Sequence, residues 1–196
     1  MTLNAILTVR TVYYGMQTVA HPDPLKAFNE RAKASGWTFT CGPATGFDHP
    51  ALNHAAALWR EKAKGRAMPA RSDLTARVMK AFMPHMSILE RVGTGKSARY
   101  RVRLHGTASA SYAGDKTGRF VDEFVPAHLL GSYTSVYDTV LELQQPLRLL
   151  RDFQAPDIDY LAGESLVAPL SRPGTSPPLI LSITYVEPRS ALTARR

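Results

Sequence analysis

Apolar and polar residues alternate strictly over residues 99–105, where Tyr100, Val102 and Leu104 are separated by arginines and followed by a histidine. This pattern predicts a β-strand with one buried face. We expect the three apolar side chains to face the core. A shift of one residue would instead turn Arg103 and its neighbours inward, where they would bind an acidic group.

Four further segments carry apolar, β-branched residues bounded by proline or glycine, which is typical of strands. They are residues 88–92, 147–153, 160–170 and 178–187. The run 93–97 reads as a hairpin turn between the first of them and the strand 99–105. Its glycines and lysine resemble the end of a phosphate-binding loop, but Glu90 stands where that motif needs a glycine and no helix pattern follows. The strands together predict a five-stranded antiparallel sheet.

Helical spacing predicts helices over residues 24–35, 50–64 and 126–145, with shorter ones starting at 72–73 and at Thr107, which we expect to be an N-cap. The helix 50–64 carries an apolar stripe that must be covered. It either pairs with its copy in a homodimer or covers the outer face of the sheet. The stripe consists of Leu52, Ala56, Trp59 and Ala63.

The element order divides the chain into an extension over 1–47, one domain with leading helices over 48–187, and a frayed tail over 188–196. Residues 3–19 are rich in Val, Thr, Ile and Tyr and suit a strand or an ordered arm. No segment outside 48–187 is long enough for a second domain of ordinary size, so we expect a stand-alone module.

Several short motifs fall at the spacing found in PAS domains: Leu58-Trp59, 69–74, 100–104, Gly106-Thr107, 117–119, Pro146 and Pro169-Leu170. On these residues the chain resembles a PAS sensor domain, and more narrowly the bacterial PAS group formerly catalogued as a domain of unknown function. The resemblance implies an α+β fold with a five-stranded antiparallel sheet and helices on one face, here with an N-terminal helical extension. It also implies a sensory or protein-interaction module, often dimeric, without catalysis.

Some PAS domains hold a small molecule between sheet and helices. Aromatic residues in the segment 107–145 are the expected lining here, with one arginine as the charged anchor, which suits a small apolar or aromatic ligand. The alternative is that these side chains only fill the core. The expected lining consists of Arg103, Tyr112, Phe120, Phe124, Tyr133 and Tyr137.

Neither haem nor flavin is expected as a cofactor. The flavin-binding photosensors of the family carry a cysteine in the helix after the second strand, and residues 107–113 contain none. His128, at the start of the long helix, is the one histidine placed to ligate haem iron, and a single histidine is not sufficient. The six histidines and one cysteine form no metal-binding pattern, and no acid–base pair or nucleophile motif is present, so we expect neither a metal site nor an enzyme.

The net charge of +8 is uneven, because residues 1–98 carry 13 Lys/Arg against 6 Asp/Glu. A basic N-terminal half leaves open a regulator associated with nucleic acid, whereas an ordinary solvated surface needs no such partner. A small-molecule carrier or an enzyme using the same cavity is a further alternative. A single cysteine, no leader and no apolar run of membrane-spanning length indicate a cytoplasmic protein that signals through a homodimer or another signalling protein.

Overall fold

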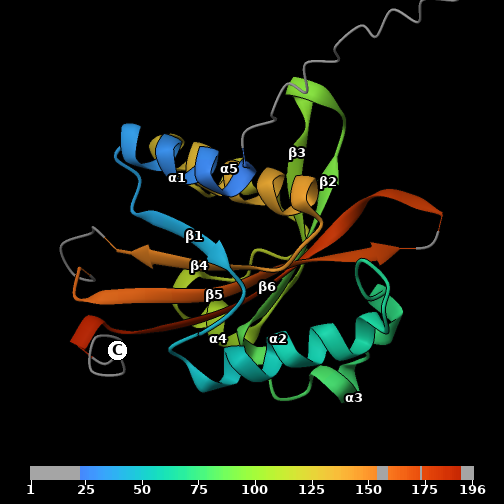
Figure 1. The fold of residues 1–196 in the computed structure, drawn as a ribbon. Helices are drawn as coiled ribbons and strands as arrows, with labels where there is room; N and C mark the ends of the chain where they lie inside the picture. The colour runs from blue at the N-terminus through green and yellow to red at the C-terminus, as the bar shows by residue number, and fades with distance from the viewer. Residues whose placement is uncertain (1–22, 154–158, 173, 191–196) are drawn as a thin grey trace, which may run out of the picture.

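Six strands form one antiparallel sheet in the computed structural model, which describes residues 23–153, 159–172 and 174–190. The sheet has the order β1-β4-β5-β6-β2-β3 and is strongly twisted (Figure 1). The strands are β1 Phe39–Pro43, β2 Met86–Val92, β3 Arg99–His105, β4 Leu147–Asp152, β5 Leu161–Arg172 and β6 Thr175–Pro188. The predicted α+β class with an antiparallel sheet is confirmed.

The sixth strand, β1, lies within residues 1–47, which were expected to form an extension outside the domain. It pairs with β4 at one edge of the sheet, where Pro43 can be accommodated without breaking a ladder on both sides. The side-chain amide of Asn29 donates to the Cys41 carbonyl oxygen (2.8 Å) and accepts from the Cys41 N–H (2.9 Å). Helix α1, Pro24–Ala34, therefore covers this edge of the sheet. Both α1 and β1 come from the segment before residue 47. The expected arm over 3–19 lies outside the described residues.

Helices cover both faces of the sheet and not one only (Figure 1). Helices α1 and α5, Ala127–Leu143, cover the face that we call the α5 face. Helices α2, Pro50–Ala63, and α3, Ala76–Met79, cover the opposite α2 face. Each side has its own cluster of buried apolar residues. None of the helices in the described part of the chain is long and apolar enough to cross a membrane.

The prediction of a helix starting at 72–73 is wrong. The chain instead forms a 3₁₀ turn at Arg71–Asp73, the four-residue α3 and a second turn at Met83–His85. The Thr75 hydroxyl accepts from the Val78 N–H and caps α3. A threonine that caps a helix start interrupts any helix arriving from before it.

The apolar stripe of α2 packs against the sheet. Leu52, Ala56 and Trp59 lie in the α2-face cluster with residues of β5 and β6, and Ala63 is buried as well. The indole N–H of Trp59 donates to the carbonyl oxygen of Pro169 at 3.0 Å, so the ring is fixed at its polar end too. His49 caps the helix, its Nδ1 accepting from the Ala51 N–H.

A buried ion cluster fixes the start of α2 on the sheet. Glu164 of β5 is 1% exposed and accepts from the backbone N–H groups of Asp48 and His49. Arg148 of β4 bridges the Glu164 and Asp48 carboxylates at 2.6 and 2.8 Å. Every charge in this cluster therefore has an opposite partner, as a buried charge requires.

A β-bulge interrupts the alternation of β3. Leu104 pairs with Ile88 and Val102 with Leu89, which leaves Arg103 as the additional residue. Tyr100 and Val102 are buried on the α5 face, but Leu104 packs against the α2-face cluster. The expectation that all three apolar residues share one face is wrong for Leu104, because a bulge reverses the side on which the following residues point.

Helix α4, Thr107–Ala113, begins one residue earlier than a Thr107 N-cap would place it. Its N-cap is Gly106, and Thr107 makes no capping hydrogen bond. The absence of a side chain at Gly106 is structural, because a Cβ there would overlap the carbonyl oxygens of Met83 and Pro84. The close approach of the backbone therefore explains why a glycine stands at position 106.

Candidate functional site

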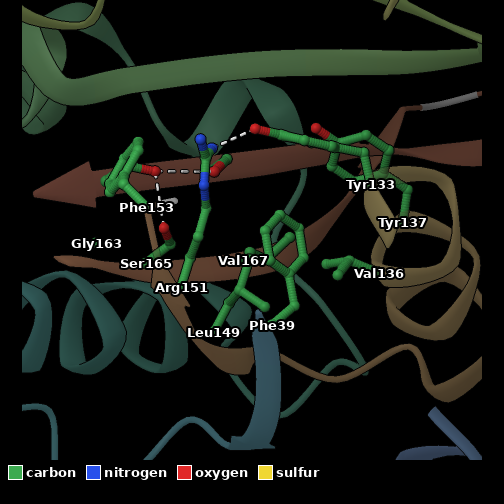
Figure 2. A pocket seen from close by; sticks show the side chains of 12 residues that line it. Phe39, Tyr133, Val136, Tyr137, Leu149, Arg151, Phe153, Gly163, Ser165 and Val167 are labelled. Carbon is green, nitrogen blue, oxygen red and sulfur yellow. Dashed lines mark hydrogen bonds between the residues drawn. The ribbon is translucent and has the colours of Figure 1, made fainter. Parts of the chain in front are cut away.

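A cavity of about 70 Å³ lies between α5 and the sheet (Figure 2). Ligand pockets in proteins usually measure roughly 300–1,000 Å³, so this one suits a much smaller molecule or a few waters. Strands β1, β4, β5 and β6 form its floor. The residues around it are Phe39, Tyr133, Val136, Tyr137, Leu149, Arg151, Phe153, Gly163, Ser165, Val167, Ser182 and Thr184.

One face of α5 supplies the cover of the cavity. Tyr133, Val136 and Tyr137 are spaced i, i+3 and i+4, which places them together on a helix surface. The Tyr133 ring meets Phe39 of β1 edge-on at 5.1 Å between centroids, and the Tyr137 ring lies 4.9 Å from Tyr100 of β3. Burial, and then the neighbouring Tyr133, raise the pKa of Tyr137 above its usual range. Its hydroxyl is therefore protonated and neutral at physiological pH.

The floor of the cavity has a polar patch formed by hydroxyl groups. Ser165 and Thr184 stand opposite each other on β5 and β6, and their hydroxyl oxygens are 2.8 Å apart. The Ser182 hydroxyl lies 3.4 Å from that of Thr184. Hydroxyl groups can donate or accept, so this patch can bind either a donor or an acceptor on a small molecule.

Among the described residues that line the cavity, Arg151 of β4 is the only charged one. Its guanidinium donates to the Tyr133 hydroxyl oxygen and lies 4.1 Å from the centre of the Phe153 ring and 5.6 Å from that of Phe39. Figure 2 shows the Arg151 side chain between Phe153 and Phe39, with a dashed line from its guanidinium to the Tyr133 hydroxyl. Within the described residues, no carboxylate forms an ion pair with it. The cavity therefore has a positive charge held by aromatic rings and one hydroxyl.

The structure brings two of the expected lining residues to the cavity, Tyr133 and Tyr137. Phe120 lies instead beneath the Arg99 guanidinium, at 3.8 Å, and Phe124 lies near Lys116 and Arg119. The Tyr112 side chain lies outside the described part of the structure. A ligand contact by any of these residues stays a prediction.

Arg103, the expected charged anchor, lies away from this cavity. Together with Arg101 and Arg172 it surrounds Glu90 of β2, which is 7% exposed. The nitrogen–oxygen distances from Arg103 and Arg172 to Glu90 are 3.4 and 3.7 Å. The three arginines thus compensate one buried carboxylate.

Sequence reasoning did not identify Arg151 or the hydroxyl patch. The signal that could have found Arg151 is alternation along β4, since Leu147, Leu149 and Arg151 share one face of a strand. The hydroxyl patch had a weaker signal, because Ser182 and Thr184 share one face of β6 by alternation but Ser165 joins them only through the pairing of β5 with β6.

Other groups with potential chemistry lie apart from the cavity. Burial raises the pKa of the Cys41 thiol to about 12, so it is a poor nucleophile at neutral pH. His128 is exposed at the start of α5. Across residues 23–153, 159–172 and 174–190, no three His, Cys, Asp or Glu side chains gather as metal ligands.

The chain matches a known protein family over most of its length. A family model described as PAS domain matches residues 47–184, which span α2 through most of β6. No curated protein matches the chain. The matched segment contains α5 and every cavity residue except Phe39.

Proposed function

Because the chain belongs to the PAS domain family, we propose that it is a sensory and signalling module whose state depends on whether the cavity beneath α5 is occupied. The occupant is a small molecule with an apolar body held by one or two polar contacts. The response is a change in binding to another protein, either a second copy of this chain or a separate signalling partner.

The observation that carries this proposal is the cavity itself. Apolar side chains such as Val136, Leu149 and Val167 form part of its wall, and the remaining wall presents hydroxyls and one guanidinium. A wall that is mostly apolar with a few convergent polar groups is typical of sites for small molecules.

Helix α5 provides a route from the cavity to the protein surface. Its inner side covers the cavity, and its neighbour α1 is tied to it where the Arg31 guanidinium donates to the Ser135 hydroxyl at 2.7 Å. A ligand that changes the position of α5 would therefore move α1 as well. This pair of helices is the surface at which we expect a partner to detect occupancy.

We further propose a cytoplasmic location. The single cysteine, Cys41, is buried and free in the structure, which suits a reducing compartment.

Native mass spectrometry of the purified protein tests the proposal, because it detects a bound small molecule and the oligomeric state together. Gly163→Val should abolish the bound mass by filling the cavity. A Cβ at Gly163 meets only ordinary contacts, the nearest at 3.6 Å from the Phe153 ring, so the variant should fold. Gly42→Val is the matched control, since Gly42 is also a strand glycine with open space around it but does not line the cavity.

The proposal fails if no small molecule is recovered and none from a metabolite collection raises the melting temperature of the parent protein. It also fails if Gly163→Val and Gly42→Val retain the same ligand equally well.

A further inference from the structure

We propose that the cavity beneath α5 binds a small carboxylic acid as its anion, with Arg151 as the anchor. This inference rests on the proposed function, because it assigns a chemical class to the occupant of the same cavity. Its basis is the charge of the wall, the free space beside the guanidinium and the size of the cavity.

Arg151 has more hydrogen-bond donors than the described residues around it accept. A guanidinium has five N–H donors, and the described residues take up one of them, through the Tyr133 hydroxyl. Aromatic rings contact its faces, which leaves the N–H groups at its edge for a ligand. A carboxylate fits that edge best, because its two oxygens match the spacing of two guanidinium N–H groups.

The space beside Arg151 comes from the residue opposite. Gly163 of β5 pairs directly with Arg151 and has no side chain to occupy the adjoining volume. Gly163 is not in a conformation that requires glycine, so its effect here is to leave room. The Ser165 hydroxyl, two residues further along β5 on the same face, can donate to a carboxylate oxygen from the floor.

The size of the cavity limits the rest of the ligand. A volume of about 70 Å³ has room for the carboxylate and a short tail, which would lie against Val136, Leu149 and Val167. A long fatty acid or a nucleotide does not fit. The expected ligands are therefore acids of the size of acetate, propionate or pyruvate.

The experiment compares acids with their neutral amides. Acetate and propionate, and then acetamide and propionamide, are titrated into the full chain by isothermal titration calorimetry at constant ionic strength. The same series is repeated with Arg151→Met, with Arg151→Lys and with Arg172→Met. Arg172→Met is the matched control, because it removes one positive charge beside Glu90 and outside the cavity.

The proposal predicts that the acids bind the parent and Arg172→Met alike, that they bind Arg151→Met about tenfold more weakly or not at all, and that the amides bind weakly to all. Arg151→Lys should be intermediate, since lysine keeps the charge but not the forked donor pair. A far-ultraviolet circular dichroism spectrum equal to that of the parent shows that each variant is folded.

Two results overturn the inference. Equal affinity of acid and amide, unaffected by Arg151→Met, would show a cavity that binds small molecules without selecting carboxylates, and the sensory proposal would survive. No binding of the acids to the parent protein would overturn the carboxylate proposal, and the search for a co-purified ligand then decides separately whether the cavity is a sensory site.

Discussion

Arg148 and Arg151 lie on the same strand, β4, three residues apart, and point to opposite faces of the sheet. On the α2 face, Arg148 lies between the carboxylates of Glu164 and Asp48, and its side chain is 19% exposed. On the α5 face, Arg151 contacts aromatic rings and a hydroxyl and has no carboxylate partner among the described residues. One guanidinium completes a structural network, whereas the other lies at a cavity.

The contrast indicates that the two faces of the sheet have different roles. The α2 face is closed by α2 and by a fully paired buried ion cluster, which fixes the helix on the sheet. The α5 face retains a cavity, hydroxyls that can bind a ligand, and a guanidinium that forms no ion pair with a described carboxylate. Stability should therefore depend most on the α2 face, and ligand response on the α5 face.

Replacement of Arg148 should have the largest effect on stability. Arg148→Met leaves the buried Glu164 and the adjacent Asp48 without their counter-charge, which should lower the free energy of unfolding by about 3–5 kcal/mol. Urea denaturation measures this loss. Arg189→Met is the control, because its ion pair with Asp152 is half-exposed and should contribute at most about 1 kcal/mol. Similar losses in both variants would contradict the structural role of the ion cluster.

Replacement of Arg151, on the α5 face, should lower the free energy of unfolding much less than replacement of Arg148. Arg151→Met exchanges a guanidinium for an apolar chain of similar length among aromatic rings. The loss of its contacts with Phe39, Tyr133 and Phe153 should lower the free energy of unfolding by less than about 1 kcal/mol in the absence of ligand. The same urea experiment measures it. A loss as large as that of Arg148→Met would mean that Arg151 is structural, and the comparison of the two faces would fail.

Gly163→Ala should slightly stabilise the ligand-free protein. Alanine reduces the freedom of the unfolded chain and fits the native backbone here, so we expect a gain of about 0.4–1 kcal/mol. The added methyl group should weaken small-molecule binding at the same time, because it occupies space beside Arg151. Thermal unfolding with and without ligand separates the two effects. A destabilised variant would show that the space beside Arg151 is smaller than the structure indicates.

The smallest effect concerns pH. His105 hydrogen-bonds Ser87 at 3.0 Å, its buried Nε2 has no partner among the described residues, and desolvation lowers its pKa. A histidine whose folded pKa is lowered stabilises the protein above its unfolded pKa of about 6.5, and that stability is lost as the pH falls through the folded value. The parent should therefore lose stability on acidification from about pH 7 to 5, and His105→Gln should lose less. The free energy of unfolding of each protein is measured by urea denaturation at each pH. If it falls equally in the parent and in His105→Gln, this contribution of His105 is excluded.

Regular patterns along the chain were sufficient to predict most of the fold. Strand β3 follows from alternation, the four further strands from apolar and β-branched runs bounded by proline or glycine, and the helices around Trp59 and Tyr133 from helical spacing. Strand β1 was missed because Phe39–Pro43 is short, contains glycine and proline, and lies at an edge. The side on which Leu104 points could not be predicted, since nothing in the residues around Arg103 marks the bulge.

The candidate site was predictable only where one helix supplies it. Tyr133 and Tyr137 follow from the spacing within α5, but the charged anchor was assigned to Arg103, which the structure places beside Glu90. Arg148 and Arg151 look equivalent in the sequence. They differ because, among the described residues, strand pairing and the start of α2 bring carboxylates close to Arg148 and not to Arg151. Only the tertiary structure shows this.

The most direct test of the account observes the two arginines of β4 together. A nitrogen-15 spectrum of the arginine side chains, recorded during titration with acetate and separately with acetamide, reports on each guanidinium Nε–H. The account predicts that the Arg151 signal, identified by its loss in Arg151→Met, shifts in a saturable way with acetate and not with acetamide, while the Arg148 signal stays in place. An unchanged Arg151 signal, or equal shifts of both arginines, would contradict the proposal that this cavity binds an acid.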